Sequence, residues 1–499
     1  MGTDGSFQQS MFAVLTGLAL AAAFPEPAAW PLAWIALVPL LIVLKKTSMK
    51  RAAGLGLLTG FVFFGALLYW VNLFGTLPWF LLSLFQALYI AVFAVLYRRL
   101  NKARPWVRLA VVPAIWTTCE WLRSLGYFGF TWGDLAISQY KNLPFLQLAS
   151  VTGTWGLSYI IVLVNISLAD AGEQWKSKSF RSALGQLAVA TAVAAIAHLY
   201  GYVRLDNITP GSHGEGLRIA LVQGSFNQDQ PVNEAYARRV MRVYSGLTRE
   251  CARRYPDVVV WPETVIPGDL LSDFQMRKRL GDLAKEMRAD LLVGGSAYKN
   301  SRLYNGAFLF NRDGDYVGEY YKVHLVPFGE TVPLRKYLPL LERYRVRDED
   351  YHPGPGFYPV GRYGVMICFE SIFPGIARQL VRRGAEVLVL MTNDGWFRRT
   401  AAPEQHMAFS VFRAVETGHW LVRCASTGIS CVIDPRGRLY GRLGLWRRGV
   451  VLATAGTGHT TFYRDNGDWF ALVCVVISGA YMACAAGWAA LGNLGSGSR

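Results

Sequence analysis

Long apolar blocks alternate with short charged segments at both ends of this 499-residue chain. Asp, Glu, Lys and Arg are all absent from residues 5–25, 27–44, 52–97, 142–169, 182–203 and 469–498. A helix needs about 20 apolar residues to cross a membrane, because each residue adds about 1.5 Å. The pattern predicts eight spans, at about 9–25, 28–45, 52–73, 78–97, 107–124, 155–171, 182–203 and 468–491.

The first block has an alternative interpretation as a signal peptide. Against this, no basic residue precedes it and further apolar blocks follow directly. We therefore expect it to be retained as a span.

Residues 204–467 follow a different pattern, in which short apolar runs typical of strands alternate with helical patterns that carry charges on one face. The runs cover 217–224, 257–263, 290–298, 306–311, 363–370, 386–394 and 449–455, and the helical patterns cover 234–254 and 272–288. Strands alternating with helices predict a layered α/β domain. The predicted parts are therefore a membrane domain (1–203), an α/β domain (204–467), and an eighth span with a short tail (468–499).

Charge predicts the orientation of these parts. Lys and Arg number four in 45–51, five in 98–108 and three in 170–181, whereas the alternate loops hold none, none and two, with Arg123 at the end of the span 107–124 counted beside Lys141. Basic loops favour the cytoplasm, so both termini should be cytoplasmic and 204–467 should lie outside. The net charge of +17 is partly explained by these loops, so no nucleic acid is expected as a partner.

Reactive side chains follow three of the predicted strands, where ligands bind in α/β sheets. Glu263 ends "VVVWPE", Cys368 ends "VMIC", and Asn393 lies in "VLVLMTND"; Lys322 lies in "YYKVHLVPFGE". Their flanks are apolar or aromatic, and poorly solvated charges usually have a partner or a purpose. From the residues alone, Cys368 stays open between a buried core thiol and a nucleophile.

The remaining cysteines indicate no further chemistry. The chain has seven, an odd number, so in an oxidising compartment at least one has no partner within the chain. Cys424 and Cys431 lie in strand-like contexts and are expected in the core. No closely spaced Cys or His cluster suggests a zinc site, so neither a metal nor a cofactor is expected.

Together these motifs resemble a known superfamily. Glu263 in "WPET", Lys322 in "YYKVHLVPFGE" and Cys368 in "ICFE" resemble the Glu-Lys-Cys triad of the nitrilase, or carbon–nitrogen hydrolase, superfamily. The membrane part resembles the apolipoprotein N-acyltransferases over 24–41, 60–71, 120–140 and 143–165, and the later part over 391–397, 403–406 and 413–430. The resemblance implies a nitrilase-like αββα sandwich between the last two of eight spans, on the periplasmic side of a bacterial inner membrane.

The resemblance also implies an activity. The family transfers an acyl chain from a phospholipid, expected to be phosphatidylethanolamine, to the α-amine of the diacylglyceryl-cysteine of apolipoproteins. Cys368 would carry the acyl chain as a thioester, and Glu263 would be the general base. Lys322 and a backbone N–H near Phe369 would stabilise the oxyanion. The helix expected to begin at Pro374, together with Lys322, should favour the thiolate. A monomer is expected.

Supporting roles are less closely defined. Glu330 should hydrogen-bond Lys322 or the incoming amine, unless it only orders its own loop. Glu370 is equally a site residue or a structural salt-bridge partner. Asn393 and Trp396 are candidate supporting or substrate-binding residues, and the Trp396 loop should face the bilayer, gate the pocket or form a buried plug.

Some residues depart from the family pattern. The stretch 222–236 lacks the usual Trp, Phe369 stands where Tyr is frequent, and Arg398 stands where Gly is usual. In the membrane part, Glu120 and Arg123 should pair structurally or meet a lipid headgroup. Two rival functions stay open: a membrane-anchored nitrilase-type amidase acting on a small molecule, and a catalytically silent membrane scaffold.

Overall fold

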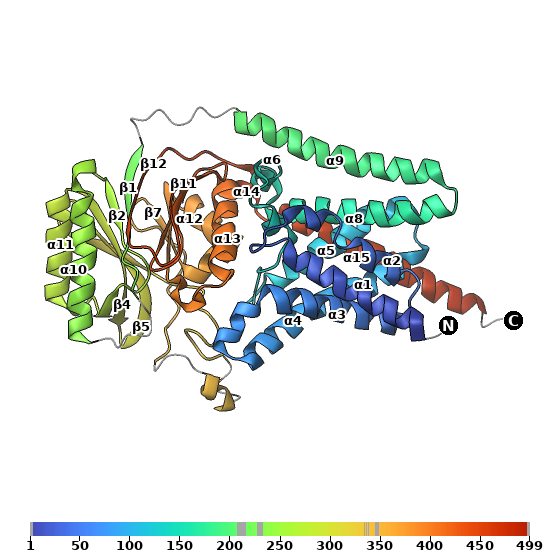
Figure 1. Cartoon of the computed structure of the whole chain (residues 1–499), viewed down its shortest axis with the longest axis horizontal. Coiled ribbons are helices and arrows are strands. Elements are labelled where there is room, and N and C mark those ends of the chain that lie inside the picture. Colours follow the sequence, from blue (N-terminus) through green and yellow to red (C-terminus); the bar gives the residue numbers. More distant parts are fainter. Residues whose placement is uncertain are drawn as a thin grey trace. The chain divides into compact units, whose positions relative to one another are not determined.

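The computed structural model describes residues 3–206, 216–226, 233–333, 335, 337, 339–344 and 349–496. Part of the stretch that departs from the family pattern, 227–232, lies outside these residues. The chain divides into two compact units, Met1–Arg204 with Asn466–Arg499 and Leu205–Asp465 (Figure 1).

The first unit is helical. Its long helices are α1 (Thr3–Ala22), α3 (Met49–Leu67), α4 (Thr76–Arg99), α5 (Pro105–Arg123), α8 (Thr154–Lys176), α9 (Phe180–Asp206) and α15 (Trp469–Ser496). Short helices are α2 (Val38–Leu44), α6 (Leu143–Leu146) and α7 (Ala149–Thr152). By length and composition, four of the described helices can cross a membrane: α3, α4, α8 and α9. The apolar helical region is confirmed, and the number of eight spans stays a prediction.

The predicted span 28–45 is a broken helix rather than a continuous one. A 3-10 helix (Trp30–Trp34) ends before α2 begins, and each has a proline in its first turn. The side chain of Asn165 fills the break: its Nδ2 donates to the Ala33 carbonyl and its Oδ1 accepts from the Leu37 N–H, both at 2.9 Å. An amide thus replaces the backbone bonds that a continuous helix would have made, as an apolar environment requires.

Buried charges pair across the helices of this unit. Asp170 of α8 lies 2.7 Å from Lys45 and 2.9 Å from Arg108 of α5, and its side chain is fully buried. Such a carboxylate needs paired cations, because an isolated buried charge is very costly.

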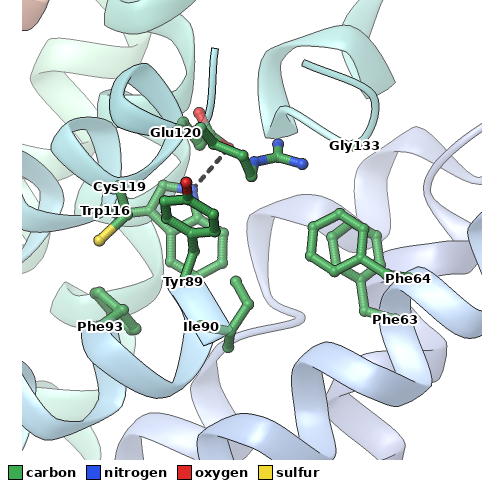
Figure 2. Close-up of a pocket in the computed structure, with 10 residues that line it drawn as sticks. Phe63, Phe64, Tyr89, Ile90, Phe93, Trp116, Cys119, Glu120 and Gly133 are labelled. Atoms are coloured by element: carbon green, nitrogen blue, oxygen red, sulfur yellow. Dashed lines mark hydrogen bonds between the residues drawn. The ribbon is translucent and has the colours of Figure 1, made fainter. Parts of the chain in front are cut away.

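Arg123 and Glu120 were expected to pair with each other, but each has other partners in the structure. Arg123 forms an ion pair with Asp134, while Glu120 accepts hydrogen bonds from the Trp116 indole and the Leu135 N–H, both at 2.8 Å. Aromatic rings, among them Phe64, Tyr89 and Trp116, line a small pocket around them (Figure 2). Both side chains therefore anchor the segment around Asp134.

The second unit contains two sheets. The first has the order β12-β1-β2-β4-β5-β6, with β3 beside β4, and the second has the order β11-β10-β9-β8-β7. The strands are β1 (Leu217–Gln223), β2 (Val258–Val260), β3 (Ile266–Asp269), β4 (Asp290–Lys299), β5 (Arg302–Phe310), β6 (Tyr316–Tyr321), β7 (Tyr363–Ile367), β8 (Val387–Thr392), β9 (Leu421–Ala425), β10 (Ser430–Ile433), β11 (Leu439–Leu443) and β12 (Gly449–Ala455). The pairs β1–β2, β2–β4, β7–β8 and β8–β9 are parallel, so their carboxyl ends point the same way within each sheet.

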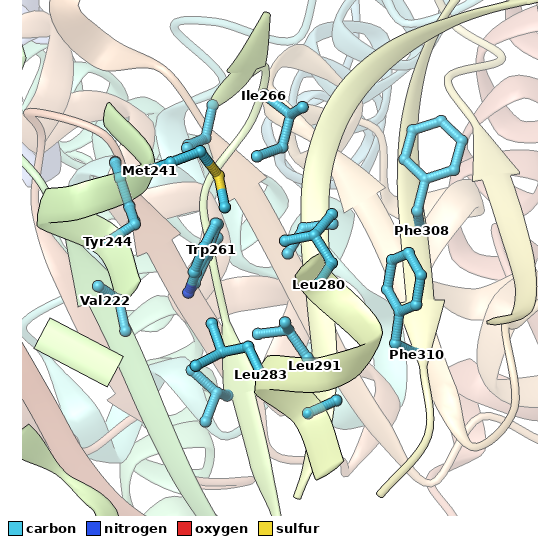
Figure 3. Packing of buried hydrophobic residues seen from close by; sticks show 14 of the residues in the cluster. Val222, Met241, Tyr244, Trp261, Ile266, Leu280, Leu283, Leu291, Phe308 and Phe310 are labelled. Atoms are coloured by element: carbon cyan, nitrogen blue, oxygen red, sulfur yellow. The ribbon is translucent and has the colours of Figure 1, made fainter. Parts of the chain in front are cut away.

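Four layers result from the packing of these sheets. Helices α10 (Glu234–Glu250) and α11 (Phe274–Met287) cover the first sheet, where Trp261 lies among Met241, Tyr244, Leu280 and Leu283 (Figure 3). Helices α12 (Pro374–Arg382) and α13 (Ala402–Thr417) contact the second sheet. A second core fills the space between the sheets, with side chains such as Ile219, Val260, Val365 and Val389. The predicted α/β class is confirmed.

Candidate active site

Two sheets contribute to one cluster of polar side chains. Glu263 follows β2, Lys322 follows β6, and both strands belong to the first sheet. Cys368 follows β7 and Asn393 follows β8 in the second sheet. The Asn393 N–H donates to Oε2 of Glu263 at 2.9 Å, so the strand ends of the two sheets meet here.

Glu263 is buried, yet both of its oxygens have partners. Its Oε1 accepts from the Asn305 side chain at 2.8 Å and lies 3.5 Å from Nζ of Lys322. Burial raises the pKa of Glu263; Lys322 acts in the opposite direction, and Glu330 adds to the rise. A carboxylate with a raised pKa is a stronger base than an exposed one.

Lys322 is almost completely buried between two carboxylates. Its Nζ lies 2.9 Å from Oε2 of Glu330, which is closer than Glu263. Burial acts to lower the pKa of Lys322, but Glu330 and Glu263 outweigh it and raise that pKa above the usual value. The side chain is therefore a fixed ammonium. Glu330 also accepts from the Val326 N–H at 2.8 Å, so it contacts Lys322 and orders its own loop as well.

Cys368 is partly exposed, unlike the other two members of the proposed triad. Its φ of +52° is left-handed, a strained conformation for a residue with a Cβ. Burial and the Glu263 carboxylate raise the pKa of the Cys368 thiol, and Lys322 only partly compensates. Lys322 thus favours the thiolate as expected, but desolvation of the sulfur has the larger effect, so the pKa of the thiol lies above its usual value in the free site.

Glu370 is fully buried and connects the two sheets through hydrogen bonds. Its Oε1 accepts from the backbone N–H groups of Val323 at 2.8 Å and His324 at 3.1 Å, and its Oε2 accepts from that of Ile367 at 2.8 Å. The Tyr320 hydroxyl donates at 2.9 Å. Burial raises the pKa of Glu370 to about 7. The carboxylate thus fixes the Lys322 segment against the turn that carries Cys368.

The other predicted supporting residues have distinct surroundings. The Asn393 side chain accepts from the Gly395 N–H at 3.2 Å and shapes its own turn. Trp396 is 42% exposed, which excludes a buried plug. The half-buried Phe369 ring lies 5.4 Å from that of Phe373. Arg398 has φ +50°, a conformation that favours glycine and explains why glycine suits this position.

Asn305, His406 and Thr392 also belong to this region, although they are not among the site residues predicted from the sequence. The Asn305 amide donates to both Glu263 and Glu330, at 2.8 Å and 3.1 Å. Asn305 could have been noticed in the sequence as a polar amide beside the apolar residues of β5. Thr392, at the end of β8, donates its hydroxyl to Asp394 at 3.1 Å and acts to lower the pKa of the Cys368 thiol.

Comparisons with known proteins agree with these two units. Residues 16–167 match the family model of the apolipoprotein N-acyltransferase N-terminal domain, and 218–464 match that of carbon-nitrogen hydrolase. An apolipoprotein N-acyltransferase of Geobacter metallireducens is 36% identical, covering 93% of each chain. Those of Gloeobacter violaceus (92% of this chain, 90% of the relative) and Chlorobaculum tepidum (95% and 96%) are both 31% identical. With this similarity over nearly its whole length, the chain belongs to the apolipoprotein N-acyltransferase family.

Proposed function

We propose that this protein is an enzyme that N-acylates apolipoproteins, with Cys368, Glu263 and Lys322 as its catalytic triad. One observation carries the proposal: a buried carboxylate and a buried ammonium, Glu263 and Lys322, lie 3.5 Å apart, and both act electrostatically on the partly exposed thiol of Cys368. This arrangement supports nucleophilic acyl transfer, in which the base takes the thiol proton only as the substrate reacts.

In the first step, Glu263 accepts the proton of the Cys368 thiol while the sulfur attacks the ester carbonyl of a phospholipid. The C–S bond forms and the carbonyl π electrons move to oxygen, where Lys322 and the Phe369 N–H stabilise the charge. The C–O bond then breaks. Glu263 returns its proton to the leaving alkoxide of the lysophospholipid, and a thioester remains on Cys368.

In the second step, the α-amine of a diacylglyceryl-cysteine attacks this thioester. Glu263 takes a proton from the amine, the C–N bond forms, and the C–S bond breaks. The thiolate released on Cys368 regains its proton from Glu263, so the enzyme returns to its starting state. Glu330 supports both steps by holding the ammonium of Lys322 at 2.9 Å.

We also propose a membrane topology, a cellular location, substrates and an oligomeric state for this enzyme. Eight spans would place both termini in the cytoplasm of a bacterial inner membrane and the catalytic domain, 204–467, in the periplasm. The loop charges support this orientation. Phosphatidylethanolamine would be the acyl donor, diacylglyceryl-modified apolipoproteins the acceptors, and a monomer the working form.

The test is incubation of the purified full-length protein with phosphatidylethanolamine, followed by intact-mass analysis. We expect a mass gain of one acyl chain, removed by hydroxylamine and absent from Cys368→Ser. Cys484→Ser, which removes an exposed thiol in α15, is the matched control and should still be acylated. A diacylglyceryl-cysteine peptide added afterwards should take up the acyl chain.

The rival amidase makes the opposite prediction. It would release ammonia from a small amide and transfer the acyl group to water, without a phospholipid-derived adduct. The failure of wild-type protein to gain an acyl chain, with hydrolysis of small amides in its place, would favour that alternative.

A further inference from the structure

The backbone carbonyl of Cys368 is held by buried side chains that the proposed mechanism does not use. Nε2 of His406, on α13, lies 3.1 Å from this oxygen, and the Ser371 hydroxyl donates to it at 3.0 Å. The same Nε2 also lies 2.9 Å from the Ser371 hydroxyl oxygen. A carbonyl oxygen only accepts, so His406 bonds the Cys368 carbonyl in the form that carries a proton on Nε2. His406 is 1% exposed and Ser371 is fully buried.

The opposite edge of the His406 ring is also fixed. Its Nδ1 lies 3.0 Å from Oδ1 of Asp394, and Arg423 donates to Oδ2 of the same carboxylate at 2.8 Å. Despite the effect of burial, Arg423 and His406 hold the pKa of Asp394 well below its usual range. The Phe397 ring meets the imidazole edge-on, with centroids 6.1 Å apart. Charge and packing together give the ring one orientation.

The Cys368–Phe369 peptide connects this arrangement with the reacting atoms. A trans peptide is planar, so the N–H of Phe369 points away from the carbonyl of Cys368. The left-handed φ of Cys368 persists only where surrounding contacts hold it. Hydrogen bonds to the carbonyl also polarise the amide, which makes its N–H a better donor.

We propose that His406 is a positioning residue that preorganises the oxyanion site. By holding the Cys368 carbonyl, it aims the Phe369 N–H at the oxygen of the acyl donor on which negative charge develops. The inference rests on the proposed function, in which Cys368 attacks a carbonyl. His406 itself does not touch the substrate and exchanges no proton with it.

Two reactions of Cys368 distinguish a role of His406 in oxyanion stabilisation from a role in the fold or in thiol reactivity. Acylation by a p-nitrophenyl fatty acid ester passes through an oxyanion, whereas alkylation by iodoacetamide displaces iodide from a saturated carbon and forms none. A loss of oxyanion stabilisation therefore slows the first reaction and spares the second. A loss of fold or of thiol reactivity slows both.

The experiment compares full-length variants in detergent. His406→Phe keeps a ring without a donor, and His406→Gln restores an amide donor. Because one oxyanion donor is worth about 10²–10³ in rate, a misaimed one should cost about 10–100-fold in the p-nitrophenolate burst. Alkylation should continue at the wild-type rate, and His406→Gln should recover part of the burst. Ser371→Ala should show a smaller loss in the same direction.

His419→Phe is the matched control, because His419 is also buried but bonds the Thr417 carbonyl instead. It should leave both reactions unchanged. An equal loss in both reactions of His406→Phe, or no loss in the ester reaction, overturns the inference. Wild-type protein that reacts with the ester but gains no acyl chain from phospholipid overturns the proposed function alone. Wild-type protein inert toward the ester overturns both.

Discussion

Lys322 lies closer to Glu330 than to Glu263: its Nζ is 2.9 Å from Oε2 of the first and 3.5 Å from Oε1 of the second. One ammonium thus compensates two carboxylates that would otherwise repel each other in a poorly solvated space. The closer contact fixes the lysine. The longer one leaves Glu263 less tightly neutralised, which suits a group that must accept a proton.

Replacing Lys322 with methionine should destabilise the α/β unit. The substitution leaves Glu263 and Glu330 buried without a cation, and breaking a buried pair in this way typically costs about 3–5 kcal/mol. Thermal unfolding followed by tryptophan fluorescence measures the effect. Adding Glu330→Gln to Lys322→Met should restore part of the loss, because one uncompensated charge is removed.

Lys299→Met is the matched control for that experiment. Lys299 also pairs with a glutamate, Glu319, at 2.9 Å, but its side chain is 54% exposed. Exposed pairs are worth about 0–1 kcal/mol, so little change in the unfolding temperature is expected. Equal losses for the two lysines would show that Lys322 does not compensate the buried carboxylates.

Glu263→Gln should slow acylation of Cys368 while leaving the fold intact. The amide retains an oxygen for the Asn393 or Asn305 donor but cannot take the thiol proton, and a general base contributes about 10²–10⁴ in rate. Intact-mass time courses with phosphatidylethanolamine give the rate. Comparable rates for wild type and Glu263→Gln, at equal unfolding temperatures, would remove Glu263 from the mechanism.

The acylation rate of the wild type should fall as the pH falls. Glu263 acts in its unprotonated form, and burial raises its pKa above that of an ordinary glutamate. Activity is therefore lost as the pH drops through this raised pKa, at a higher pH than an exposed carboxyl would give. Rates measured between mildly acidic and mildly basic pH test this, and a flat profile contradicts it.

The sequence is informative where a local pattern determines the local structure. The apolar runs beginning at Leu217 and Gly449 form β1 and β12, and Pro374 begins α12 as expected. Cys424 and Cys431 are fully buried in strands, as predicted. Each of these features depends on the pattern of neighbouring residues.

Contacts between distant segments could not be predicted in the same way. Strand β11 has no buried face to give a pattern, with four of its five residues exposed, and its place is set by pairing with β10. The Asn393 N–H donates to Glu263, 130 residues away in the sequence, and the Asn165 side chain accepts from the Leu37 N–H, 128 residues away. Only the packed structure brings such partners together.

Glu370→Gln should destabilise the link between the two sheets. Both carboxylate oxygens accept from N–H groups, so an amide nitrogen must face at least one donor. A buried donor left unsatisfied costs about 1–3 kcal/mol, which thermal unfolding can detect. Glu386→Gln, at an exposed glutamate that pairs with Arg362, is the control and should have little effect. If the two variants unfold alike, Glu370 does not hold the Lys322 segment to the Cys368 turn.

Asn165→Leu should destabilise the helical unit, because its amide satisfies two backbone groups at the break before α2. Leucine is similar in size but leaves the Ala33 carbonyl and the Leu37 N–H without this partner. Side-chain hydrogen bonds within membranes average about 0.6 kcal/mol each, so a loss of about 1–2 kcal/mol is expected. Ser167→Ala is the control on the same helix, because the Ser167 hydroxyl bonds only within α8, to Leu163. Thermal unfolding in detergent compares the two variants. An Asn165→Leu variant that unfolds at the same temperature as the wild type would mean that the break is satisfied without Asn165, and that proline positions alone divide this helix.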